Sequence, residues 1–185
     1  MSMHTIGRIA AVIGLSVTLA AVTLAGTASA ATDVAPDVKL GDLPVQGSCP
    51  SSSWYVHVSC FNVINLTGSS LNYRDEGINL GEWQPADPPQ LIPDRTKAMF
   101  EAHDTNNGWG VGEGVRGYFR YWIGDTGRDF MVQFDNRGSD TGPAPSYTFQ
   151  SVDPQVHYRW VNTGGVVSNP LLLIWKGQYE PHITP

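Results

Sequence analysis

Short apolar segments alternate with clusters of glycine, asparagine, aspartate and proline from Trp54 to Tyr179, and none of them repeats with a helical period. The clearest alternation is in 129–135, where Phe130, Val132 and Phe134 occupy every second position. This period of two predicts a strand with one buried face. Similar patterns predict strands in 54–64, 71–78, 96–103, 115–123, 147–149, 156–160 and 171–175. We therefore predict an all-β domain, a sandwich or barrel of about eight strands with little or no helix.

The alternation slips once, in the first of these predicted strands. Trp54, Val56, Val58 and Cys60 follow a period of two, and Phe61 then breaks it. A single slip of this kind arises from a β-bulge or from a strand that is buried on both faces. Both explanations are open at the level of the sequence.

The first thirty residues have the pattern of a secretory signal peptide. Arg8 precedes an apolar run over 9–25, and 28–30 reads Ala-Ser-Ala, which a signal peptidase accepts. We predict cleavage after Ala30 and a secreted, extracellular protein. A retained membrane anchor is the rival interpretation, because the apolar run is close to the length that spans a bilayer. Residues 31–53 are rich in proline and serine and predict an extended N-terminal arm, which leaves 54–185 as the β-domain.

The charge of the chain argues against two classes of partner. The 185 residues carry a net charge of −6, and removal of residues 1–30, which contain Arg8 and no acidic residue, makes it −7. The basic residues are scattered singly between acids, whereas a nucleic-acid binder needs clustered Lys and Arg to neutralise phosphates. We predict no nucleic-acid partner and no capture by anionic lipid through charge alone. A zwitterionic lipid headgroup or a sugar remains open.

Two cysteines, Cys49 and Cys60, are present. Export to an oxidising compartment makes a disulfide the default for such a pair. It would tie the first strand of the domain to the arm before it. The alternative is two unpaired thiols, and a metal site is not expected because no histidine stands at ligand spacing.

The common catalytic motifs are absent from the sequence. A glycosidase needs only two carboxylates on a β scaffold, and Glu82, Glu101, Glu113 and Asp135 are the residues that could supply them; solvated carboxylates are the plainer explanation. His57, His103 and His157 fall in predicted strands, where a catalytic or metal role would require two of them to converge. We predict a non-enzymatic protein with no catalytic residue, no metal and no cofactor.

Three aromatic residues lie in predicted loops or directly at their ends. Trp83 precedes a proline-rich loop, Trp109 stands among glycine and asparagine residues, and Tyr147 follows a loop of Gly, Asp and Pro. Such rings could form a platform for a choline headgroup, a sugar or a bilayer interface. The alternative is that each ring is buried and pins its own loop.

The order and spacing of several short motifs resemble those of the aegerolysin and actinoporin type of secreted β-sandwich and its bacterial relatives. These motifs extend over most of 65–147, and they are Asn65-x-Thr67-Gly68-x-x-Leu71, Gly81-x-Trp83, Pro88 with Ile92-Pro93, Phe100-x-Ala102, Gly112-x-Gly114 with Tyr118, and Phe130-x-Val132-x-Phe134-Asp135-Asn136 with Tyr147. The resemblance implies a single two-sheet antiparallel β-sandwich that binds membrane lipids, often sphingolipids. It also implies that some members form pores, alone or with a protein partner.

The resemblance further places Asp135, Asn136 and Tyr147 near a headgroup. The chain departs from the pore-forming pattern, because residues 31–53 contain three prolines and no apolar stripe for an amphipathic helix. Our interpretation is a lipid- or membrane-surface-binding protein with candidate ligand residues Trp83, Trp109, Asp135, Asn136 and Tyr147, or a cytolysin-like component that needs a partner. The alternatives are a structural or interaction protein of the cell envelope and a carbohydrate-binding or carbohydrate-active domain.

Overall fold

The computed structural model of the protein describes residues 37–50, 55, 57–84, 87–105, 114–137, 144–161 and 167–185. The predicted signal peptide, Trp54, Trp109 and Glu113 lie outside these ranges. Within them the chain forms fourteen strands and one 3-10 helix: β1 (Asp37–Lys39), η1 (Leu40–Asp42), β2 (Val45–Gly47), β3 (Val58–Leu66), β4 (Leu71–Leu80), β5 (Glu82–Gln84), β6 (Leu91–Ile92), β7 (Thr96–His103), β8 (Val115–Ile123), β9 (Asp129–Asn136), β10 (Ser146–Ser151), β11 (Val156–Val161), β12 (Val167–Ser168), β13 (Leu171–Lys176) and β14 (His182–Thr184). None of the helical structure in the described ranges has the length and apolar character that crossing a bilayer requires.

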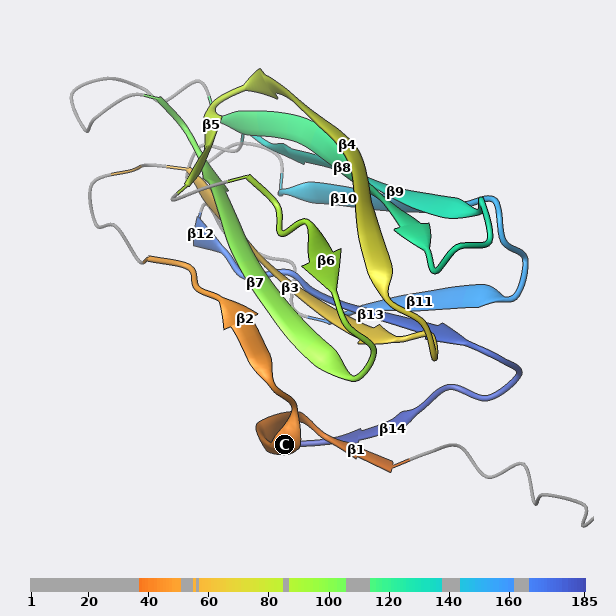
Figure 1. The fold of residues 1–185 in the computed structure, drawn as a ribbon. Coiled ribbons are helices and arrows are strands. Elements are labelled where there is room, and N and C mark those ends of the chain that lie inside the picture. The colour runs from red at the N-terminus through yellow and green to blue at the C-terminus, as the bar shows by residue number, and fades with distance from the viewer. Residues whose placement is uncertain are drawn as a thin grey trace, which may run out of the picture. The chain divides into compact units, whose positions relative to one another are not determined.

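The described strands form three sheets (Figure 1). One has five strands in the order β10-β9-β8-β4-β6, and a second has seven, β11-β13-β3-β7-β2 with β12 beside β3 and β5 beside β7. The third is the pair β1 and β14. The all-β prediction is confirmed, but the prediction of about eight strands in two antiparallel sheets is wrong. Several added strands are only two or three residues long, too short to show a period of two.

The strand directions also depart from a purely antiparallel arrangement. The pairs β13 with β3, β12 with β3, β2 with β7 and β1 with β14 are parallel. A period of two reports which face of a strand is buried and carries no information on the direction of its neighbour. The sequence pattern therefore could not predict that these pairs are parallel.

The main core fills the space between the five-stranded and seven-stranded sheets. In β8 the inward residues Val115, Phe119, Tyr121 and Ile123 are buried and alternate with the less buried positions between them. From the opposite sheet, Phe61 packs its ring against those of Phe100, Phe119 and Phe134, at centroid distances of 5.5, 5.1 and 4.9 Å. The alternation seen in the sequence thus corresponds to one buried face for each of the long strands β8 and β9.

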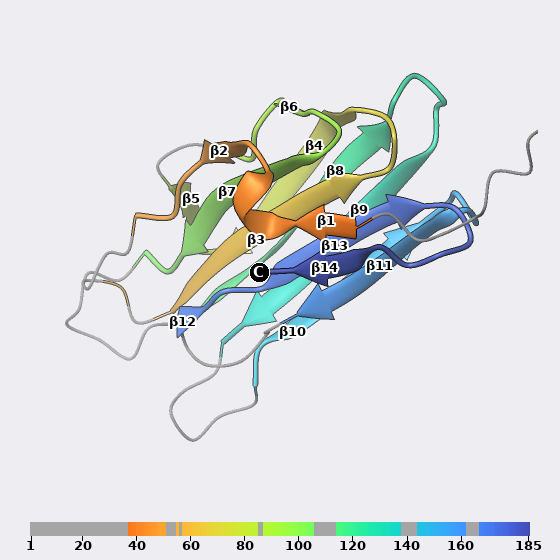
Figure 2. The ribbon, with the colours of Figure 1, turned by 90° about the horizontal axis from the view of Figure 1, so that it is seen from below.

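Strand β3 is buried on both faces. Phe61 and Val63 belong to the main core, whereas Ile64 belongs to a second cluster with Val38, Leu43, Leu173 and Trp175. This second cluster lies beneath β1 and β14, which run over β3 and β13 on the outer side of the seven-stranded sheet (Figure 2). The slip in the alternation at Phe61 is therefore explained by double burial.

The segment expected to form an extended arm is described from 37 to 50 and joins the sheets there. It supplies β1 and β2, and β2 pairs with β7. The predicted disulfide is confirmed, with the Cα atoms of Cys49 and Cys60 5.7 Å apart. The bond fastens the end of this segment to β3, as the sequence led us to expect.

Candidate functional site

The outer face of the five-stranded sheet combines arginine with aromatic side chains. On β8 the outward positions are Arg116, Tyr118, Arg120 and Trp122, in strict alternation with the buried ones. On β9 the outward positions include Gln133 and Asp135. Because neighbouring strands place these side chains side by side, residues that are separated in the sequence form a continuous polar and aromatic surface.

A first groove of about 280 Å³ opens on this face. It is lined by Asn79, Arg116, Gly117, Tyr118, Gln133, Phe134, Asp135, Ser146 and Thr148. Gly117 brings the backbones of β4 and β8 close together, since a Cβ atom at this position would lie 2.3 Å from the carbonyl oxygen of Gly77. Glycine is thus required at this point of the sheet, where the groove is formed.

The first groove holds opposite charges next to an aromatic ring. Asp135 accepts two hydrogen bonds from Arg137, at 2.7 Å from Nε and 2.6 Å from Nη2, and lies 3.9 Å from Nε of Arg116. The hydrogen bonds and charge of Asp135 raise the pKa of Arg137. The Arg116 side chain is 55% exposed, so its guanidinium group remains accessible to a ligand. The groove therefore presents a guanidinium group and a carboxylate side by side.

A second groove of about 370 Å³ lies on the same face and is lined by Arg74, Arg120, Asp129, Met131, Gln150, Ser151 and Val152. Arg74 forms an ion pair with Asp129, and its guanidinium carbon lies 4.1 Å from the centre of the Trp122 ring. Arg120 lies 3.8 Å from Asp129 and 3.7 Å from Asp75. The second groove thus holds two arginines around Asp129, and Asp75 pairs with Arg120 from beside the lining.

The structure separates the five candidate residues. Asp135 faces outward and lines the first groove. Asn136 is buried, and its Nδ2 donates to the carbonyl oxygen of Val58 at 3.1 Å and to Oγ of Ser59 at 3.4 Å. Tyr147 also contacts Ser59, with 3.1 Å between the hydroxyl oxygens, and makes a hydrogen bond with Ser168. Asn136 and Tyr147 are therefore brought together on the core side of the sheet, away from Asp135.

Trp83 and Tyr147 both pack against Phe61, with ring centroids 6.1 Å and 5.9 Å from it. Both residues are partly buried against the main core. Burial raises the pKa of Tyr147, against the hydrogen bonds from Ser168 and Ser59. Trp83 lies in β5 and Tyr147 in β10, so both rings belong to strands rather than to the loops expected from the sequence. Trp109 lies outside the described residues.

No protein-family model and no curated protein sequence matches the chain. Solved structures do match its fold. RahU, crystallised in complex with a TRIS molecule, matches at a TM-score of 0.55 and 11% identity, over 68% of this chain and 99% of RahU. The lipid binding protein Nakanori matches at a TM-score of 0.52 and 11% identity, over 66% of this chain and 71% of Nakanori. The chain therefore shares the fold of these two proteins. The resemblance seen in the sequence motifs is thereby confirmed at the level of the fold.

The remaining carboxylate and histidine candidates lie in other parts of the fold. Glu82 and Glu101 lie on neighbouring strands of the seven-stranded sheet, and Oε1 of Glu82 is 3.8 Å from Nε2 of the buried His103. His57 is buried and pairs with Asp104 at 3.2 Å, whereas His157 is exposed. Among the described residues no group of three His, Cys, Asp or Glu side chains is arranged to hold a metal ion.

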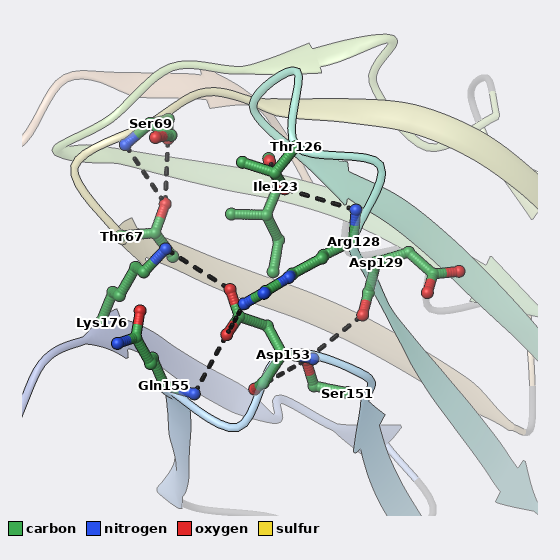
Figure 3. A network of polar contacts seen from close by, with 10 residues as sticks. All are labelled: Thr67, Ser69, Ile123, Thr126, Arg128, Asp129, Ser151, Asp153, Gln155 and Lys176. Carbon is green, nitrogen blue, oxygen red and sulfur yellow. Dashed lines mark hydrogen bonds and ion pairs between the residues drawn. The ribbon is translucent and has the colours of Figure 1, made fainter.

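A buried carboxylate fixes the turn between β10 and β11, which borders the second groove (Figure 3). Asp153 pairs with Arg128 at 2.9 Å and with Lys176 at 3.4 Å, and accepts a hydrogen bond from the backbone N–H of Gln155 at 3.1 Å. Although burial opposes ionisation, this hydrogen bond and the two cations lower the pKa of Asp153. No local sequence pattern indicates this network, because its members come from three separate segments of the chain.

Proposed function

We propose that this protein is a secreted, non-enzymatic β-sandwich that binds neutral lipid headgroups at a membrane surface through the first groove. The observation that carries the proposal is the presence of Arg116, Asp135 and Tyr118 in one groove on the outer face of a sheet. A zwitterionic headgroup carries a phosphate and a quaternary ammonium group a few bonds apart. The planar guanidinium of Arg116 suits the phosphate, and the carboxylate of Asp135 and the ring of Tyr118 suit the ammonium.

Two further observations support this proposal. Nakanori, which shares the fold, is described as a lipid binding protein, and RahU holds a TRIS molecule in its crystal structure. The net charge of −6 opposes binding to anionic membranes, so a neutral headgroup is the lipid class that fits this chain.

Secretion through cleavage after Ala30 belongs to the same proposal, and N-terminal sequencing of the exported protein tests it.

Vesicle co-sedimentation tests the function itself. The mature protein is incubated with vesicles of phosphatidylcholine, of sphingomyelin and of phosphatidylserine, and we expect it to pellet with the first two. Arg116→Gln removes the group that would contact the phosphate and should weaken binding about ten-fold. Arg159→Gln is the matched control, because Arg159 is also half-exposed and pairs with Glu180 at 2.5 Å on the other sheet. Failure to pellet with any composition would overturn the proposal.

The burial of Trp83 and Tyr147 favours a second candidate, a structural or interaction protein of the cell envelope whose aromatic residues all serve the core. This candidate predicts no vesicle binding and equal behaviour of Arg116→Gln and wild type. The same co-sedimentation experiment therefore separates the two functions.

A further inference from the structure

We propose that the second groove is a second headgroup site, so that one face of the sheet binds two zwitterionic, phosphate-bearing lipid headgroups at once. This inference rests on the proposed function and adds to it a site that includes none of the candidate residues drawn from the sequence. It names the occupant as lipid at a membrane surface.

The two grooves repeat one arrangement along β8 and β9. Arg116 and Arg120 stand four residues apart on the same strand face, a spacing of about 13 Å. Each lies next to an aspartate of β9, Arg116 at 3.9 Å from Asp135 and Arg120 at 3.8 Å from Asp129. The aromatic rings of Tyr118 and Trp122 alternate with the two arginines. The strand geometry thus places an arginine, an aspartate and an aromatic ring together at two positions on one face of the sheet.

The arginines of the second groove are held in position before any ligand arrives. Arg74 is fixed between Asp129 and the ring of Trp122, and its side chain is 31% exposed. Arg120 reaches both Asp75 and Asp129, and its Nη2 atom lies 3.3 Å from the sulfur of Met131. A thioether is a weak acceptor, so a phosphate oxygen that replaced it would gain a charge-assisted hydrogen bond. Little side-chain entropy would be lost in that exchange.

The charges of the second groove match a zwitterion better than an anion. Both of its arginines pair with Asp129, which lines the groove, and with Asp75, which stands beside the lining and whose side chain is 41% exposed. The phosphate of a zwitterionic headgroup can approach the guanidinium groups while the ammonium group of the same headgroup approaches the Asp75 carboxylate. An anionic lipid would leave this carboxylate facing a negative charge. The rim includes Val152, which is 67% exposed and offers apolar surface to the membrane.

Two sites on one face make binding bivalent. Once the first groove holds a headgroup, the second binds a neighbouring lipid at the high local concentration of the bilayer. Membrane binding should then rise more steeply with the mole fraction of phosphatidylcholine than single-site binding does. Loss of either groove should leave weak, single-site binding.

Insertion of one negative charge into each groove tests this inference without breaking an ion pair. Gln133 and Gln150 line the first and second grooves and are exposed, so Gln133→Glu and Gln150→Glu keep side-chain size and should not alter the melting temperature. Gln178→Glu, at an exposed position after β13, adds the same charge and is the control. Partitioning onto phosphatidylcholine vesicles is measured for each. We expect about five-fold weaker binding for either groove variant, a greater loss for the double variant and no change for the control.

The outcomes separate this inference from the function on which it rests. If Gln133→Glu weakens binding and Gln150→Glu binds like wild type, the second site is overturned and the proposed function stands. If neither variant weakens the binding of wild type, both grooves are overturned as the site. If wild-type protein does not bind the vesicles, the proposed function fails and the second site fails with it.

Discussion

Glu101 is a buried carboxyl group with no partner among the described residues. It lies in β7, and both carboxylate oxygens are inaccessible to solvent and without a hydrogen bond. Burial raises the pKa of Glu101 from 4.5 to about 7. The folded state therefore holds a proton that the unfolded state has released between these pH values. Because the folded state binds more protons, the contribution of Glu101 to stability is greatest below pH 4.5 and falls as the pH rises through 7.

Glu101→Gln should flatten this dependence of stability on pH. The amide cannot ionise, so the loss of unfolding free energy between pH 5 and pH 8 should shrink by about 1–3 kcal/mol. Urea unfolding at the two pH values measures it. Glu76, whose pKa burial and Asp87 raise to about 7, would leave a residual slope. Glu82→Gln, at a side chain that is 59% exposed, is the control, and an unchanged slope in Glu101→Gln would contradict the account.

Part of the geometry of the candidate site could be predicted from single residues of the sequence. The alternation in 129–135 places Asp135 on the other face of the strand from Phe134 and Asn136. Asp135 and Asn136 therefore could not both contact one ligand from a regular strand. The partners of Tyr147, by contrast, were not foreseeable. Ser59 and Ser168 lie 88 and 21 residues away from it, and only the pairing of distant strands brings their hydroxyl groups to the tyrosine.

At the level of elements, the pairing of β4 with β8 depends on glycine at position 117. Gly117→Ala would place a Cβ atom 2.3 Å from the carbonyl oxygen of Gly77 and 3.0 Å from the ring of Phe134. Neither neighbour can yield easily, because one is backbone and the other is packed in the core. We expect a loss of about 2 kcal/mol or more in unfolding free energy, measured by denaturant titration. Gly127→Ala, at a turn with open space around it but a positive φ of 68°, should cost less. Equal costs would contradict this packing argument.

The disulfide joins the N-terminal segment to β3, and its removal should lower the stability of the protein. Cys49 and Cys60 are 11 positions apart, so loss of the bond should lower the unfolding free energy by about 2–3 kcal/mol. Thermal unfolding of Cys49→Ser and of wild type, each with and without reductant, measures it. Reductant should lower the melting temperature of wild type alone. A wild-type protein indifferent to reductant would contradict this stabilising role.

Long strands were predictable from the sequence and short ones were not. β7, β8 and β9 each extend over eight or nine residues, enough for a period of two to appear. β6 and β12 have two residues each and are defined only by their partners β4 and β3. The core side of the sandwich was therefore predictable residue by residue, whereas sheet order and strand direction were fixed by tertiary contacts.

At the level of the whole molecule, folding gathers charges that the sequence scatters. Arg74, Arg116, Arg120 and Arg137 come from three separate segments, and the five-stranded sheet brings all four to one region with Asp75, Asp129 and Asp135 among them. Along the sequence, these basic residues stand singly and form no cluster. Their alternation in space, on a molecule with a net charge of −6, favours a zwitterionic surface over an anionic one.

Amide chemical-shift mapping during a titration with phosphocholine is the most direct test of the central claim, because it reports where the headgroup binds as well as whether it binds. We predict saturable shifts concentrated on Arg116, Tyr118, Gln133 and Asp135 of the first groove, with weaker ones at Arg120 and Met131. Shifts that are absent at high phosphocholine concentration, or confined to residues of the seven-stranded sheet, would contradict the claim that this face binds a neutral lipid headgroup.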